Sequence, residues 1–351
     1  MKVAINFLVM FFGFGFCVAQ QKYQLPDLMQ PQDLLVFQNK ILILEDTTIY
    51  VFEMKHDKKN KHLKLLKSFG NKGKGPGEME TSPFNPNRLY LDGQSILVDS
   101  SNKLLYFDLN GEFLKEIRKP ARLILQTLPV SGGFVTKELD RSDGRTEFIT
   151  INLVSSSMEK IAELYRQPSP IQLTYGDMIA DAVFVTANED RIFIERSLEG
   201  ICVDVFDHQG HKLKTVKKKM KPRIVTEMDK KEIMDAYKDD PLVKEIGFNN
   251  LKASVEFRFP ETYPPVLEMR ASNHILYLQT SFSDSKTTTY YALDLDSFNL
   301  NQLVLPTCQK GEDLAQTNGV GIRHFYFSTD SFFVLLEDEE NETWHIQLIQ
   351  L

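Results

Sequence analysis

Short stretches of alternating apolar and polar residues, bounded by Gly, Asn, Asp and Ser, follow one another along most of the chain after Asp33. Such alternation predicts β-strands with one buried face. A strand, a tight turn and a second strand also recur at intervals of roughly 45 to 55 residues, which is typical of stacked or radially arranged units. Four copies are recognisable, at residues 106–114, 151–156, 205–213 and 292–298. The pattern predicts several β-units packed together, because one such unit cannot bury its own face.

Grouping the predicted strands in fours gives six units, at residues 34–68, 88–117, 123–164, 183–217, 266–305 and 324–348. The sixth unit is one strand short. Residues 22–25 form a separate extended segment that can supply its outer strand and close a ring, which removes the exposed sheet edges. We therefore predict an all-β fold, a six-bladed β-propeller of four-stranded antiparallel blades, rather than a sandwich with about 7 to 9 strands.

One segment carries helix signals instead of strand signals. Thr226 followed by Asp229 resembles a capping box, Pro241 can open a second helix, and Gly247 can end it. We predict a small helical insertion at residues 226–247, between blades 4 and 5.

Residues 1–19 have the composition of a secretory signal peptide. Lys2 gives a positive start, residues 3–16 are almost wholly apolar, and Ala19 provides a small residue for cleavage. The apolar stretch is too short for a bilayer-spanning helix, which takes about 20 residues. We expect a cleaved leader and a mature propeller domain at residues 20–351 that does not span a membrane.

The expected destination is the periplasm or the extracellular medium. Lipidation of Cys17 is disfavoured, because the bulky Phe16 precedes it where a small residue is needed. An exported compartment would permit Cys202 and Cys308 to pair. The alternative, two unpaired and partly buried thiols, is the interpretation we favour.

The chain is acidic overall. It has 41 Lys and Arg residues against 48 Asp and Glu residues, and loss of Lys2 with the leader would change the net charge from −7 to −8. Because nucleic acids select basic surfaces, this balance argues against a nucleic-acid partner.

One blade resembles an NHL-type repeat. The resemblance lies in segments 69–78, 86–90, 96–99, 102–108 and 111–113, with 259–265 as a supporting echo. In this respect the chain is similar to secreted bacterial six-bladed propellers related to the NHL and TolB-like propellers. The resemblance implies a scaffold used for protein binding, ligand binding and several enzymatic reactions. The single Trp344 excludes repeated Trp-Asp blades, and a glycine pair that occurs only once argues against a kelch array.

The connectors between blades differ from the turns within them. In a ring of up-and-down blades, the blade-to-blade connectors share one face with the turns between second and third strands, and the remaining turns share the other. Four connectors are long and rich in Pro, Gly and charge, at residues 70–87, 166–182, 218–265 and 306–322. We expect the functional site on this connector face, because long loops on a rigid scaffold commonly carry binding.

The loop at residues 70–78 has two interpretations. Its backbone amides, with Lys72 or Lys74, could cradle a phosphate. However, it lacks the Lys-Ser/Thr ending of a P-loop and precedes a strand rather than a helix. We favour a simple blade-to-blade connector.

Acidic residues recur in the turns between second and third strands. They could hold a hard cation such as Ca²⁺, which needs several oxygens at one point. Asp is also favoured in turns for its local hydrogen bonds, and we favour this interpretation and expect no cofactor. The residues are Asp46, Asp99, Asp143, Asp284 and Asp338.

Basic residues at or near the starts of inner strands form another candidate site. Inner strands line the central channel, so their side chains could converge on an anionic ligand. The alternative is a set of solvated rim charges. Together with two of the acidic residues and the connector before blade 5, the ligand-binding candidates are Arg88, Asp99, Asp143, Arg258, Glu261, Tyr263, Arg270, Arg323 and His324.

Several further signals bear on function. A run of lysines at residues 214–221 is interpreted as a solvated strand edge that discourages sheet-to-sheet pairing. No Gly-x-Ser-x-Gly elbow and no His-Glu-x-x-His helix occurs. We expect an exported, non-catalytic propeller that binds a protein, peptide or glycan on the connector face. The alternatives are a metal-dependent lactonase-like or lyase-like enzyme with its site at the channel mouth, and a purely structural envelope protein.

Overall fold

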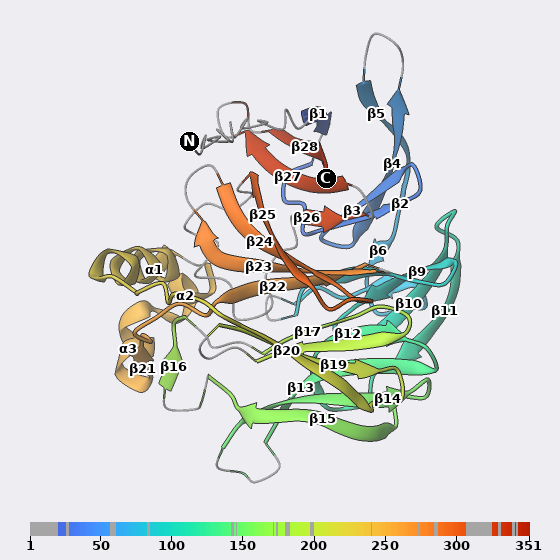
Figure 1. Cartoon of the computed structure of the whole chain (residues 1–351). Helices are drawn as coiled ribbons and strands as arrows, with labels where there is room; N and C mark the ends of the chain where they lie inside the picture. Colours follow the sequence, from blue (N-terminus) through green and yellow to red (C-terminus); the bar gives the residue numbers. More distant parts are fainter. Residues whose placement is uncertain are drawn as a thin grey trace, which may run out of the picture.

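The computed structural model describes residues 20–351 except 26–27, 57–60, 83–84, 142–143, 145, 171, 173–174, 180–182, 197–199, 240, 273, 284–286, 307–324, 329–330, 339–340 and 342. The predicted leader lies outside these residues. Six four-stranded sheets form a β-propeller, and three helices lie at one side of it (Figure 1). None of the helices in this part of the chain is long and apolar enough to cross a membrane.

Blades 1 to 3 each consist of four consecutive antiparallel strands in sequence order. Blade 1 contains β2 (Asp33–Phe37), β3 (Lys40–Glu45), β4 (Thr48–His56) and β5 (Lys61–Phe69). Blade 2 contains β8 (Arg88–Asp92), β9 (Ser95–Asp99), β10 (Lys103–Asp108) and β11 (Phe113–Arg118). Blade 3 contains β12 (Leu123–Val130), β13 (Gly133–Asp140), β14 (Phe148–Ser155) and β15 (Lys160–Pro168).

Blades 4 and 5 repeat this order, and blade 6 takes its outer strand from the start of the described chain. Blade 4 contains β17 (Phe184–Ala187), β18 (Arg191–Glu195), β19 (Gly200–Asp207) and β20 (Lys212–Lys219). Blade 5 contains β22 (Val266–Ala271), β23 (Ile275–Ser283), β24 (Thr287–Asp294) and β25 (Leu300–Pro306). Blade 6 contains β26 (Phe325–Phe327), β27 (Ser331–Asp338), β28 (Thr343–Gln350) and β1 (Gln20–Leu25). The predicted fold class is confirmed.

The recurring turn explains why these sequences form hairpins. In blades 2 and 4, the Oδ1 atoms of Asp108 and Asp207 each accept hydrogen bonds from the amides two and four residues further along. Gly111 and Gly210 follow with φ of 72° and 88°, a left-handed conformation that glycine adopts without strain. Asp294 accepts similar local bonds in blade 5. An Asp at the end of one strand therefore starts the turn into the next.

β1 closes the ring. It pairs antiparallel with β28, from Gln20 opposite Ile349 to Leu25 opposite Trp344. The side chains of Tyr23 and Leu25 are 1% exposed and pack in an apolar cluster with blades 6 and 1. The predicted closing strand is therefore confirmed, and it removes the free edge that β28 would otherwise present.

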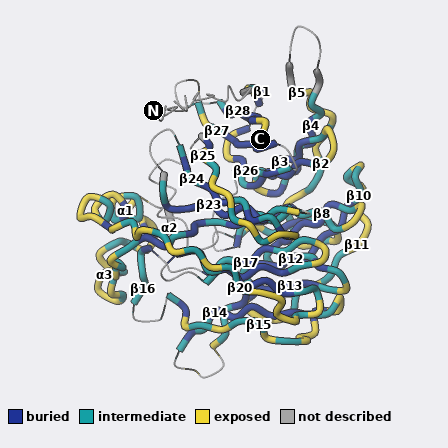
Figure 2. Tube along the Cα trace, viewed as in Figure 1, coloured by how far each residue is buried: buried dark blue, intermediate teal, exposed yellow. Residues whose placement is uncertain are grey.

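The hydrophobic core consists of six apolar clusters, one between each pair of neighbouring blades. Figure 2 shows the buried residues along the strands in the middle of the ring and the exposed ones on the helices and outer strands. Each blade buries its two faces only against its neighbours, so no blade has a core of its own.

The helical insertion is longer than the sequence indicated. It contains α1 (Glu227–Asp239), α2 (Pro241–Ile246) and α3 (Phe248–Ser254). The capping box is present, because Asp229 N donates to Thr226 Oγ1 and Thr226 N donates to an Asp229 carboxylate oxygen. Gly247, with φ of 89°, ends α2 but only separates it from α3. The helical segment therefore continues beyond the predicted end.

We expect Tyr23→Ala to lower the free energy of unfolding by about 3 kcal/mol, the usual cost of truncating a buried aromatic residue. Lys22→Ala, on the exposed side of the same strand, should change it by less than about 0.5 kcal/mol. Urea unfolding followed by the fluorescence of the single Trp344 measures both variants. A loss below about 1 kcal/mol for Tyr23→Ala would contradict a closing role for β1.

Candidate functional site

The insertion and the connector between blades 3 and 4 fold together. β16 (Tyr175–Asp177), from the connector, pairs parallel with β21 (Glu256–Arg258), from the end of the insertion. A small apolar cluster joins the same segments through Ile179, Ile233 and Tyr263. We call the described residues of 175–179 and 223–263 the docking platform. It lies at one side of the blades (Figure 1), where two blade-to-blade connectors meet.

Tyr263 is a structural residue of the docking platform. Its side chain is buried, and the Arg223 guanidinium lies 4.2 Å from the centre of its ring. Arg223 also pairs with Asp229, at 3.6 Å between Nη2 and Oδ1, and donates a bond to Ser281 O. Burial, together with the nearby Asp229 carboxylate, raises the pKa of the Tyr263 hydroxyl to about 12. Tyr263 therefore helps to hold the base of the insertion, and its ligand-binding role stays a prediction.

Arg258 lies on the docking platform and not in an inner strand. Its Nη2 is 2.7 Å from Glu256 Oε2, and its guanidinium lies 3.9 Å from the centre of the Tyr175 ring. Its side chain is 45% exposed, so it remains accessible on the platform surface. Glu261 is also exposed, and its backbone carbonyl accepts a bond from Val225 N at 2.9 Å. The predicted position of Arg258 near the start of an inner strand is therefore wrong, and ligand binding by Arg258 and Glu261 stays a prediction.

Three aromatic residues of the docking platform contact one another. The rings of Phe248 and Phe257 are stacked, with centroids 5.9 Å apart and planes inclined by 10°. Tyr237 meets Phe257 edge-on at 5.4 Å. All three side chains are half-buried, so part of each ring faces solvent. Half-exposed aromatic rings are typical of recognition surfaces.

Arg270 takes part in a charged contact between inner strands. Its Nη2 lies 3.6 Å from Asp33 Oδ1, and its Nε lies 3.0 Å from Glu268 Oε1. Asp33 Oδ2 also accepts a bond from Leu89 N at 2.7 Å. Blades 1, 2 and 5 are thus connected through one buried carboxylate. Arg270 also lies near the end of β22 rather than its start, and its charge is already neutralised.

Arg88 begins β8, as predicted, but it is buried. The sequence analysis missed its neighbour Lys137, a 4% exposed residue of β13. Burial, together with the positive charge of Arg88, lowers the pKa of the Lys137 ammonium to about 7. The only sequence signal for this buried lysine was its position in the middle of an otherwise regular strand. That signal did not indicate that Arg88 lies nearby.

Asp99 is not a rim residue. Its side chain is buried, Lys119 Nζ lies 2.5 Å from its Oδ1, and Thr127 N donates to its Oδ2 at 2.7 Å. Lys119 is buried as well, and it precedes blade 3 in the chain. The carboxylate therefore joins blade 2 to blade 3.

Asp46 and Asp338 have the geometry and local bonds of turn-forming residues. Asp46 has φ of 53°, and Asp338 accepts a side-chain bond from Asn341 at 2.9 Å. Within the described part of the chain, no group of three or more His, Cys, Asp or Glu residues is arranged to hold a metal ion. These observations support the turn-forming interpretation for Asp46 and Asp338.

Several predicted features lie outside the described residues. They are the leader with Cys17, the site candidates Asp143, Arg323 and His324, the turn residue Asp284, and Cys308. Cys202 is half-buried and forms no disulfide with any described residue. The interpretation of Cys202 and Cys308 as two unpaired thiols stays a prediction.

The glycine-rich loop holds a carboxylate of its own chain where a phosphate would have to lie. Gly75 N donates to Glu78 Oε2 at 2.8 Å, and a Cβ at Gly73 would collide with the same carboxylate. Lys72 and Lys74 pair with Asp46 and Glu80, respectively. The two-stranded pair β6 (Asn71–Lys72) and β7 (Glu78–Met79) fixes the loop further. The structure supports the connector interpretation.

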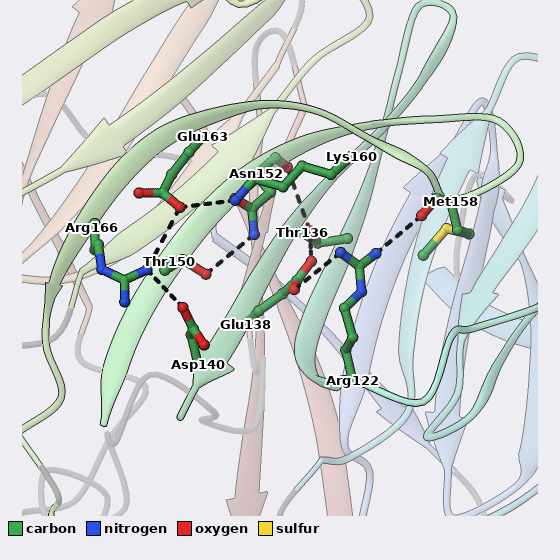
Figure 3. Close-up of polar contacts among 10 residues, drawn as sticks. All are labelled: Arg122, Thr136, Glu138, Asp140, Thr150, Asn152, Met158, Lys160, Glu163 and Arg166. Atoms are coloured by element: carbon green, nitrogen blue, oxygen red, sulfur yellow. Dashed lines mark hydrogen bonds and ion pairs between the residues drawn. The ribbon is translucent and has the colours of Figure 1, made fainter. Parts of the chain in front are cut away.

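Blade 3 carries a charged network on one face (Figure 3). Arg166 Nη1 lies 2.7 Å from Asp140 Oδ2 and 3.7 Å from Glu163 Oε2. Arg122 Nη1 lies 3.5 Å from Glu138 Oε2. The sequence analysis singled out none of these residues. Because its positive and negative groups meet within the blade, the network is largely neutralised.

Comparisons with known proteins assign no family to this chain. No family model matches the chain, and no curated protein matches it. Similar solved structures include the AfRom2 CNH domain, at 11% identity and a TM-score of 0.40, covering 94% of this chain and 99% of that one. The Neurospora crassa Pan2 WD40 domain has 8% identity and a TM-score of 0.41, covering 91% and 88%. A Bacteroides caccae protein of unknown function has 12% identity and a TM-score of 0.33, covering 87% and 82%. The NHL and TolB-like resemblance stays a prediction.

We expect Lys119→Met to lower the free energy of unfolding by about 3 to 5 kcal/mol, because it leaves the buried Asp99 carboxylate without its counter-charge. Lys74, an exposed residue that pairs with Glu80, provides the control. Lys74→Met should lower the free energy of unfolding by less than about 1 kcal/mol. Chemical unfolding of the purified variants measures both. Equal effects of the two substitutions would contradict a structural role for the buried pair.

The buried Lys137 predicts a rise of stability with pH. Between pH of about 7 and 10.5 the unfolded chain keeps a proton on this lysine that the folded protein has lost, so the free energy of unfolding increases across this window. Lys137→Met removes this contribution. We expect the variant to be more stable than the parent at pH 7, with a difference that shrinks towards pH 10. Unfolding curves across this range measure it, and parallel curves would show that Lys137 does not titrate there.

Proposed function

We propose that the protein is an exported, non-catalytic β-propeller that binds a protein, peptide or glycan through its connector face, with the docking platform as the contact element. The β-propeller is commonly a binding scaffold. The observation that carries the proposal is the pairing of β16 with β21, which joins two connectors into one ordered surface. Binding surfaces of this kind gain from pre-organisation, because less conformational entropy is lost when the partner binds.

The composition of the docking platform supports this function. Tyr237, Phe248 and Phe257 form an interlocked, half-exposed aromatic group, and Arg258 lies over Tyr175 on the other face of β21. Aromatic residues and arginine are enriched at the centres of binding interfaces. An apolar cluster of its own joins the segments of the platform and holds them in one arrangement.

A metal-dependent enzyme is less well supported. Such an enzyme would need several oxygen ligands at one point near the channel mouth. Asp99, one of the carboxylates considered for it, is held in a buried ion pair with Lys119. Arg270 and Asp33 also neutralise each other between the inner strands. These contacts hold blades together, which favours binding over catalysis as the function of this face.

Export is compatible with the way the ring closes. The proposed cleavage after Ala19 would leave Gln20, where β1 begins, as the first residue. The complete closing strand would therefore be retained in the mature protein.

We expect the mature protein from a secreting bacterial host to begin at Gln20, because the leader has a short positive start, an apolar stretch and a small residue at its end. Intact-mass spectrometry and N-terminal sequencing measure this. Cys17→Ser should be processed and released identically. A lipid-modified Cys17 or a retained leader would contradict the proposal.

The docking platform can be tested with a phage-displayed peptide library and a glycan array. We expect selected ligands to bind a Tyr237→Ala, Arg258→Ala double variant about tenfold or more weakly, because aromatic and arginine residues dominate interface energy. The matched control is Phe113→Ala, Leu114→Ala, which alters two exposed apolar residues of β11 in blade 2. Ligands that depend on the control pair and not on the platform pair would contradict this location.

A further inference from the structure

A groove lies between the outer parts of blades 4 and 5. It has a volume of about 350 Å³ and is formed by the end of β20, the residues that follow it, and strands of blade 5. We call it the lysine groove. Its lining residues are Lys219, Met220, Lys221, Phe282, Thr289, Tyr291 and Gln302.

The lysine groove carries positive charge that the described protein does not neutralise. Neither Lys219 nor Lys221 forms an ion pair with a described carboxylate, although the chain has a net charge of −7. On β20, the one described ion pair is that of Lys212 with Asp204. Blade 3 shows the opposite arrangement, because its charges meet within the blade (Figure 3). The groove is therefore complementary to an anionic partner.

The other groups in the lysine groove favour a carboxylate-bearing chain. The Tyr291 hydroxyl donates to Gln302 Oε1 at 3.4 Å, so the Gln302 amide nitrogen is left as a donor. Met220 and Phe282 provide apolar surface between the polar groups. Lys218 Nζ lies 5.0 Å from the centre of the Tyr291 ring, and this ring is buried, so it offers no open face to a stacking sugar. Ammonium groups, an amide donor and apolar surface suit an acidic peptide better than a sugar.

The strand leading into the lysine groove has a free edge. β20 is the outermost strand of blade 4 and, among the described strands, pairs with β19 alone. Lys212, Lys214, Lys217 and Lys219 follow one another along it. Lysines on an edge repel other basic strands and are costly to bury against neutral ones. This fits the interpretation of the run as an edge that discourages sheet-to-sheet pairing. The same lysines attract an acidic strand, whose backbone can bond to the free edge.

We propose that the lysine groove and the adjoining edge of β20 bind an extended acidic segment of a partner polypeptide, with its carboxylates on Lys219 and Lys221. The partner chain adds to the edge of the blade through backbone hydrogen bonds, and charge selects its sequence. This inference goes beyond the docking platform, because the two surfaces share no residue. Either can fail without the other.

The test uses the purified protein and a labelled peptide, acetyl-(Glu-Thr)₄-amide, whose glutamates share one face when the peptide is extended. We expect saturable binding by fluorescence anisotropy at low ionic strength, weakening as salt screens the charges. The variant Lys219→Gln, Lys221→Gln should bind about tenfold or more weakly. Unfolding curves of this variant should match those of the parent, because both side chains are exposed.

The control variant is Lys64→Gln, Lys115→Gln, which removes two exposed lysines from the outer strands of blades 1 and 2. It should bind the peptide as the parent does. Equal weakening in both variants would show a general charge effect and overturn the proposal. Tri-galacturonate and inorganic phosphate serve as competitors. Displacement of the peptide by either one at a lower concentration than unlabelled peptide would identify an acidic sugar or phosphate site instead, and no binding of the peptide would overturn the proposal outright.

Discussion

The antiparallel pairing of β1 with β28 closes the ring of six blades, and the other features of the fold rest on this closure. Each blade buries its faces only against its neighbours, so six blades need six interfaces. Tyr23 and Leu25 complete blade 6 beside blade 1, where its packing would otherwise be unfinished. Because residues from the two ends of the chain share one sheet, opening the ring would cost the contacts of both.

Closure of the ring also determines where the connectors meet. The segments after β15 and β20 are far apart in sequence, yet they lie close enough in space for β16 and β21 to form one small sheet. The docking platform is therefore a consequence of the blade arrangement and not of either connector alone. Its own apolar cluster joins its segments, and Arg223 donates a bond to Ser281 O of blade 5, which distinguishes it from an unsupported loop.

Charged residues have different roles in the centre and at the periphery. Near the inner strands, Asp33 contacts Arg270 and Asp99 contacts Lys119, and each carboxylate also accepts a backbone bond from a neighbouring blade. These groups are buried, so they must be paired for the fold to tolerate them. At the outer edge of blade 4, by contrast, the lysines are hydrated and need no ion pair. Their positive charge is therefore available to a binding partner.

The candidate site was only partly predictable. Arg258 was predicted near the start of an inner strand, with Glu261 and Tyr263 in the connector before blade 5, because they are close in sequence. Their environments were not predictable, since Arg258 packs on a tyrosine from another connector and Tyr263 lies beneath the helices. Asp99 looked like any other turn aspartate, although the lysine that neutralises it comes from the segment before the next blade.

Local sequence is sufficient for the features that depend on near neighbours: the strands, the turns begun by Asp108 and Asp207, and the capping box of α1. The alternation of apolar and polar residues indicates the strands, and the hydrogen bonds of the turns and the capping box join residues at most four positions apart. Three other features follow from the folded arrangement: Glu78 fills the glycine-rich loop, Lys137 is buried near Arg88, and a groove opens beside Lys219. The burial of Lys137 near Arg88 and the opening of the groove depend on which blades become neighbours. The position of Glu78 depends on how the loop folds back on itself. Composition and periodicity therefore specify none of these features.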